Sequence, residues 1–178
     1  MIGTVTTLQE YLNTSYEPDR EFVEPGTLVE RNLGTPRHGL LQTLIAGFFL
    51  QYRKTHDLAI FTETRLSMQG GHRFRIPDVM VLHRPYKKGK VIVDVPTLVV
   101  EIKSPDDTLG EMIAKCIEYE RLGVSSILVV DPDRDNLRGW LFVQGKLQLI
   151  EGGTVSLKVQ GEAIDVPFGQ MFEELEED

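Results

Sequence analysis

The chain is poor in cysteine and in long apolar runs. Among its 178 residues only Cys116 carries a thiol, which excludes an internal disulfide and favours a reducing compartment. The longest apolar stretch, GLLQTLIAGFFL at 39–50, contains two polar residues and is too short to span a bilayer. The first twelve residues lack the basic start and the continuous apolar segment of a secretion signal. We therefore expect a cytoplasmic protein with no membrane partner.

Several familiar site motifs are missing as well. There is no P-loop, dinucleotide-binding glycine fingerprint, zinc-type Cys/His cluster, HExxH sequence or nucleophile-elbow serine. A net charge of −8 argues at first sight against a nucleic-acid partner, but five of the acids lie in the last six residues, 173–178. Between Arg65 and Lys90, seven basic residues surround a single acid, Asp78. This basic segment suits a phosphate backbone and equally suits a solvated loop.

Hydrophobic periodicity and capping residues predict one mixed domain over 1–178. Helices are expected at 6–13, at 35–54, from 108 to 123, and in a short segment before the acidic tail 173–178. In the helix from 108, the residues predicted to be buried are Leu109, Met112, Ile113, Cys116 and Ile117. Strands are expected at 58–66, 74–82, 91–103 and 125–132, with hairpins around Pro25-Gly26 and Gln144-Gly145. The order predicts an α/β (α+β) fold with a central mixed sheet flanked by helices, plus additional hairpins.

Charged residues interrupt two of the apolar strands. In TLVVEIKSPDD at 97–107, alternation places Glu101 and Lys103 on one face of the strand, and in FRIPDVMVL at 74–82 a single acid, Asp78, follows Pro77. Buried charges are costly unless they are paired or functional. Neighbouring strands would bring Asp78 and Glu101 together at one end of the sheet. The alternative is an ion pair between Glu101 and Lys103, with Asp78 merely ending a strand.

Two converging carboxylates would repel each other in a dry site unless a cation neutralised them. Oxygen ligands favour Mg²⁺ or Mn²⁺ over zinc. Such an ion polarises a phosphoryl oxygen and acidifies a bound water, and a nearby lysine stabilises the charge that develops at phosphorus. The set Asp78, Glu101 and Lys103 therefore indicates a phosphodiester hydrolase.

Pro-Asp followed by Glu-x-Lys resembles the PD-(D/E)xK nuclease superfamily, which has the restriction-endonuclease-like fold. Further segments are similar to a bacterial family of predicted restriction endonucleases, namely EFVEPGTLVER, PRHGLLQTLI, PDVMV, VVEIKSP, KCIEYERLGV and LVVDP. Together they cover about residues 21–132. The resemblance implies an endonuclease that depends on Mg²⁺ (or Mn²⁺), acts on DNA and uses no small-molecule cofactor. Because duplex cutting needs two sites, it also implies a homodimer.

The resemblance also implies which residues form the site. The catalytic candidates are Asp78, Glu101, Lys103 and Lys115. The metal ligands would be Asp78, Glu101 and the main-chain carbonyl of Ile102, and the secondary candidates are Glu30, His38 and Tyr119. Lys115 matches a lysine that many family members keep when the strand lysine is missing; because both are present here, which one acts stays open.

Lys115 and the three secondary candidates also have ordinary explanations. Lys115 lies four residues after Glu111 and could pair with it, and Tyr119 continues the same helix face. His38 suits a structural or exposed position, and Glu30 suits the surface. The alternative function is a catalytically inactive nucleic-acid-binding or protein-interaction module on the same scaffold.

Overall fold

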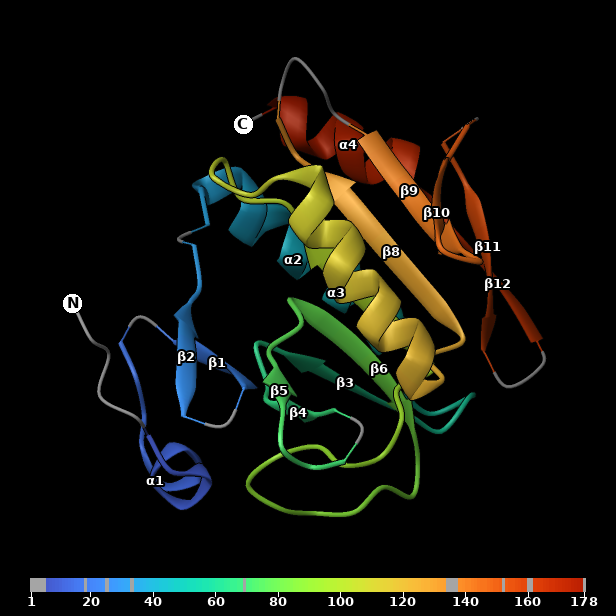
Figure 1. Ribbon diagram of the computed structural model, residues 1–178. Helices are drawn as coiled ribbons and strands as arrows, with labels where there is room; N and C mark the ends of the chain where they lie inside the picture. Colours follow the sequence, from blue (N-terminus) through green and yellow to red (C-terminus); the bar gives the residue numbers. More distant parts are fainter. Residues whose placement is uncertain are drawn as a thin grey trace.

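The computed structural model describes residues 6–17, 19–24, 26–32, 34–68, 70–133, 138–151, 153–159 and 162–177. Its centre is a six-stranded mixed sheet with the strand order β10-β9-β8-β7-β6-β3 (Figure 1). The strands are β3 (Leu58–Thr62), β6 (Val79–His83), β7 (Leu98–Ile102), β8 (Ser126–Asp131), β9 (Arg138–Val143) and β10 (Lys146–Leu149). Strands β7 and β8 are parallel because helix α3 (Leu109–Leu122) connects them, and the other neighbours in this sheet are antiparallel.

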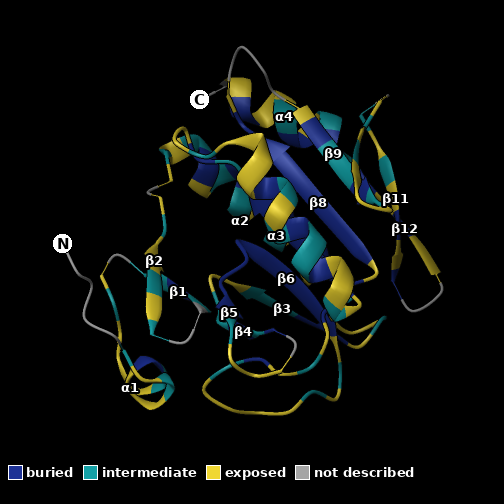
Figure 2. Ribbon diagram, viewed as in Figure 1, coloured by how far each residue is buried: buried dark blue, intermediate teal, exposed yellow. Residues whose placement is uncertain are grey.

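Helices cover both faces of this sheet (Figure 1). On one face, α2 (Pro36–Leu50), α4 (Phe168–Glu177) and the hairpin of β11 (Val155–Val159) and β12 (Glu162–Val166) share one apolar core with alternate strand residues. On the other face, α3 packs Met112, Cys116 and Tyr119 against the remaining strand residues. Figure 2 shows β6 and β8 buried along most of their length, as expected for strands covered on both sides.

A second, smaller sheet has the order β2-β1-β5-β4. Its strands are β1 (Arg20–Glu24), β2 (Thr27–Glu30), β4 (Leu66–Ser67) and β5 (Phe74–Arg75), and helix α1 (Leu8–Asn13) packs beside it. The Tyr11 ring lies 5.2 Å from the Phe22 ring and 5.5 Å from the Phe74 ring, centroid to centroid. This aromatic cluster attaches α1 to the small sheet.

The predicted architecture, a central mixed sheet flanked by helices, is confirmed. Helix α3 has the expected capping box of Thr108 and Glu111, and Gly123 ends it with φ 100°. The hairpin at Gln144-Gly145 joins β9 to β10, and both turn residues have positive φ. Strands β1 and β2 form the other predicted hairpin; Pro25, at its turn, lies outside the described residues. Among the described residues, no helix is both long enough and apolar enough to cross a membrane.

The strand boundaries differ from the prediction because the chain changes sheets. The segments 58–66 and 74–82 each begin in one sheet and end in the other, and 91–103 is a strand only over Leu98–Ile102. The first change follows Glu63, whose φ of 46° turns the backbone out of β3. Alternation indicates a strand but does not indicate to which sheet the strand belongs. The hairpin of β11 and β12 was not predicted.

Three further expectations are wrong. Helix α2 ends at Leu50 rather than near residue 54. Leu109, in the first turn of α3, is 45% exposed, and Tyr119 takes its place in the buried stripe. The acidic segment is not a separate tail, because 173–177 belongs to α4 and Leu175 is buried in the core. Asp178 lies outside the described residues.

Candidate active site

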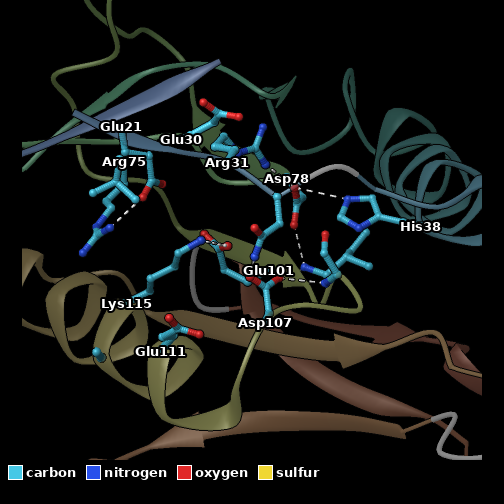
Figure 3. A pocket seen from close by; sticks show the side chains of 15 residues that line it. Glu21, Glu30, Arg31, His38, Arg75, Asp78, Glu101, Asp107, Glu111 and Lys115 are labelled. Atoms are coloured by element: carbon cyan, nitrogen blue, oxygen red, sulfur yellow. Dashed lines mark hydrogen bonds and ion pairs between the residues drawn. The ribbon is translucent and has the colours of Figure 1, made fainter. Parts of the chain in front are cut away.

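Two antiparallel strands bring Asp78 and Glu101 together. Val79 of β6 pairs with Val100 of β7, so Asp78, one residue before β6, comes opposite Glu101 near the end of β7. Both side chains are almost fully buried, at 2% and 1% exposure. They line a cavity of about 300 Å³ at this end of the sheet (Figure 3). The predicted convergence of the two carboxylates is therefore present.

Asp78 is held in place by three hydrogen-bond donors. Its Oδ1 lies 2.5 Å from Nη2 of Arg31 and 3.3 Å from Nε2 of His38, and its Oδ2 accepts from the Ile102 N–H at 2.6 Å. Burial opposes ionisation, but the contact with His38 and the charge of Arg31 outweigh it and hold the pKa of Asp78 below its usual value. Asp78 is therefore a carboxylate at neutral pH. The side chain of Gln42 donates to its main-chain carbonyl at 2.9 Å.

Glu101 is held by two residues of α3. Nζ of Lys115 lies 3.2 Å from one carboxylate oxygen, and the Tyr119 hydroxyl donates to the other at 2.5 Å. Burial, assisted by the negative charge of Asp78, raises the pKa of Glu101. Burial of Lys115 would lower its pKa, but the negative charge of Glu101 raises it, which keeps the lysine protonated. Asp78, Glu101 and Lys115 thus place two acids and one ammonium group around one cavity.

The two candidate lysines lie in different places. Lys115 lines the cavity, where Figure 3 shows its side chain extending toward Glu101. Lys103 lies just beyond the end of β7, and its Nζ is 3.6 Å from Asp131 in a neighbouring pocket with Pro36 and Pro132. The ion pair between Glu101 and Lys103, considered as an alternative, is therefore wrong: Lys103 follows the last strand residue, so the alternation no longer sets its direction.

The structure also shows where the secondary candidates lie. His38, expected to be structural or exposed, is 7% exposed and contacts Asp78, and Tyr119 contacts Glu101. Glu30 lies on the rim of the cavity with its side chain 59% exposed, paired with Arg20 at 3.4 Å. Its predicted surface position agrees with the structure. Asp131, the partner of Lys103, is buried at the end of β8.

The sequence reasoning missed Arg31, Glu21 and Arg75. Glu21 accepts hydrogen bonds from Nη1 of Arg75 at 2.6 Å and from the Ile76 N–H at 3.0 Å, and Arg75 also makes two hydrogen bonds to Glu118 of α3. This buried network joins the small sheet to α3 across the cavity wall. Its partners lie 43 or more residues apart in the sequence, so no local spacing could have revealed it.

The prediction that the basic segment surrounds Asp78 is wrong. Asp78 precedes β6, whereas the loop from Arg84 to Lys90 begins after His83, at the other end of the same strand. Arg75 does lie at the site end, where Glu21 and Glu118 already pair with it. The lysine-rich loop therefore lies away from the cavity.

The residues of the cavity suit a hard cation. Carboxylates outnumber cationic side chains six to three among the residues that line it: Glu21, Glu30, Asp78, Glu101, Asp107 and Glu111 against Arg31, Arg75 and Lys115. No group of three or more His, Cys, Asp and Glu side chains in the described part of the chain is arranged to hold a metal. Two buried carboxylates meet in the cavity, Asp78 and Glu101, and both already face hydrogen-bond donors of the protein. Mg²⁺ is commonly bound by one or two carboxylates, with water and substrate phosphate as its other ligands.

The fold is restriction-endonuclease-like and agrees with that of a solved structure. A crystal structure described as "a putative nuclease belonging to DUF820" from Anabaena variabilis ATCC 29413 is similar with a TM-score of 0.78 and 19% identity; the match covers 96% of this chain and 99% of that one. A cryo-electron microscopy structure of a DrdV–DNA complex matches with a TM-score of 0.39 and 13% identity, over 74% of this chain and 11% of that one. No curated protein has a matching sequence.

Residues 8–167 match the family described as "Uma2: Putative restriction endonuclease", and the chain belongs to this family. The resemblance inferred from the sequence motifs is thereby confirmed. Family membership supports a nuclease function in general.

Proposed function

We propose that this protein is a divalent-metal-dependent endonuclease that hydrolyses DNA phosphodiester bonds at the cavity lined by Asp78, Glu101 and Lys115. The observation that carries the proposal is the meeting of two buried carboxylates, Asp78 and Glu101, beside the protonated Lys115. Membership of a restriction endonuclease family supports the same conclusion.

Asp78 and Glu101 would hold Mg²⁺ or Mn²⁺, with the main-chain carbonyl of Ile102 as a further candidate ligand. When bound, the ion would polarise a phosphoryl oxygen and lower the pKa of an attacking water. Tyr119 fixes the direction of the Glu101 carboxylate, and the Ile102 N–H and His38 fix that of Asp78. Lys115, held protonated by Glu101, would stabilise the negative charge that builds up on the phosphoryl oxygens.

The positions of the two lysines favour Lys115 over Lys103 as the catalytic lysine. Lys115 contacts one of the proposed ligands, whereas Lys103 pairs with Asp131 in the neighbouring pocket. Cutting both strands of a duplex requires two such sites, so we propose a homodimer as the active form.

The test is cleavage of supercoiled plasmid DNA with Mg²⁺ or Mn²⁺, followed by gel electrophoresis. We expect Asp78→Asn and Lys115→Met to reduce the cleavage rate by about 10²-fold or more, the range found for groups that act on the reacting atoms. Lys103→Met is the matched control, and it should retain a rate within a few-fold of the original protein. Cleavage that survives Asp78→Asn would refute the assignment of the site. Loss of cleavage in Lys103→Met with full activity in Lys115→Met would reverse the choice of lysine.

A further inference from the structure

Arg31 bridges a buried acid and an exposed one. Its Nη2 lies 2.5 Å from Oδ1 of Asp78, and its Nη1 lies 3.5 Å from Oε1 of Glu63. The side chains of Asp78 and Glu63 are 2% and 55% exposed, and that of Arg31 is 16% exposed. One guanidinium group therefore reaches from the floor of the cavity to the solvent (Figure 3 shows its contact with Asp78).

The same carboxylate would have to serve a divalent cation. Oδ2 of Asp78 already accepts from the Ile102 N–H, and Oδ1 faces both Arg31 and His38. A guanidinium group and a divalent ion on one buried carboxylate repel each other strongly, because the surroundings screen charge poorly. A cation that binds at Asp78 therefore competes with Arg31.

Glu63 offers a second position for the guanidinium group. It is already within ion-pair distance, and its own N–H donates to the Asp78 carbonyl at 3.3 Å, so it stays beside the site. The main chain of Arg31 is fixed by its N–H bond to the Asp19 carbonyl at 3.1 Å, and the next residue, Asn32, is bonded to Asp107 at 2.7 Å. Rotation of the Arg31 side chain alone is enough to shift its contact from Asp78 toward Glu63.

We infer that Arg31 is a built-in counter-cation: it neutralises Asp78 in the metal-free protein and transfers to Glu63 when a divalent ion binds. This inference rests on the proposed function, since it takes Asp78 to be a metal ligand. Its consequence is that Arg31 lowers the affinity for the metal while it stabilises the empty site. Arg31 thereby sets the metal concentration at which the site fills.

The experiment measures Mn²⁺ binding to the whole protein by electron paramagnetic resonance of the free ion, without DNA. Arg31→Met should bind Mn²⁺ about tenfold more tightly than the original protein, a coupling of ordinary size. Arg31→Lys, which keeps the charge and is the variant to use if Arg31→Met folds poorly, should fall between the two. Arg20→Met removes the same charge from the partner of rim residue Glu30 without touching Asp78, and it should shift the affinity less than twofold.

Glu63→Gln tests the second position. Glu63→Gln should weaken Mn²⁺ binding in the original protein. It should have little effect in the Arg31→Met background, because that variant has no guanidinium group for Glu63 to bind. Unfolding by heat gives an independent readout. Without metal, Arg31→Met should unfold at a lower temperature than the original protein, and Mn²⁺ should raise its unfolding temperature by more.

The Mn²⁺ measurements separate a failure of the counter-cation inference from a failure of the metal site. If the original protein binds Mn²⁺ and Arg31→Met binds it no more tightly than Arg20→Met, the counter-cation inference is overturned and the metal site stands. If both the original protein and Arg31→Met leave Mn²⁺ free, the metal site and the inference fall together.

Discussion

At the scale of single residues, the Tyr119 hydroxyl makes a buried hydrogen bond to a carboxylate that has few other donors. Removing it with Tyr119→Phe leaves an oxygen of the buried Glu101 without this donor, so we expect a loss of about 1.5–3 kcal/mol in the free energy of unfolding. The measurement is urea unfolding of the metal-free protein.

A second buried tyrosine supplies the matched control for this prediction. The Tyr11 hydroxyl donates to a neutral carbonyl, that of Arg20, at 3.0 Å. Tyr11→Phe should therefore cost only about 0.5–1.5 kcal/mol, because hydrogen bonds to uncharged acceptors contribute less. Equal losses in the two variants would mean that Glu101 is not charged in the folded protein.

The opposite pKa shifts of Glu101 and Asp78 predict opposite pH dependences of the free energy of unfolding. The folded protein raises the pKa of Glu101 above its usual 4.5, so the folded state binds this proton more tightly than the unfolded state does. The free energy of unfolding should then fall as the pH rises from 4.5 through the folded-state value. Asp78, whose pKa is lowered from 3.8, stabilises the fold above that pH and loses this contribution as the pH falls through its folded-state value.

Urea unfolding of the metal-free protein over a pH series tests the Glu101 part of this prediction. Glu101→Gln has no titrating group at this position, so its free energy of unfolding should lack the decline above pH 4.5 that the original protein shows. A difference between the two proteins that stays constant with pH would contradict the raised pKa.

At the scale of elements, α4 closes one end of the core rather than extending from it as an acidic tail. Leu175 is 1% exposed among core residues, and Arg37 of α2 donates to its carbonyl at 2.7 Å and to the Glu176 carboxylate at 2.8 Å. We expect Leu175→Ala to lower the free energy of unfolding by about 2–5 kcal/mol, as other large-to-small core substitutions do. Glu174→Ala, on the exposed side of the same helix, should change it by less than about 0.5 kcal/mol. A small loss in Leu175→Ala would show that α4 is not part of the core in solution.

Elements with strong local signals were predicted well, and elements defined by distant partners were not. Thr108 and Glu111, three residues apart, cap the start of α3, and Gly123 alone ends it, so the limits of α3 were correct. The strands that change sheets carry no such local mark, because which sheet a strand joins depends on partners far along the chain.

At the scale of the whole molecule, the motifs predicted the fold and the approach of Asp78 to Glu101. The antiparallel pairing of β6 with β7 brings these two residues opposite each other. They did not reveal which lysine reaches the cavity. Lys103 belongs to the strand motif but lies just after the end of β7, whereas Lys115 is placed by the packing of α3 on the sheet. Arg31 was missed because its contact with Asp78 spans 47 residues and joins the two sheets.

The single thiol gives this chain a natural reporter. Cys116 is fully buried, and burial raises its pKa to about 12, so it is inert to sulfhydryl reagents while α3 lies on the sheet. It is adjacent to Lys115 on that helix. Alkylation of Cys116 under native conditions therefore reports openings in which α3 separates from the sheet and Lys115 leaves the acidic cavity. The frequency of such openings can be followed without introducing a label.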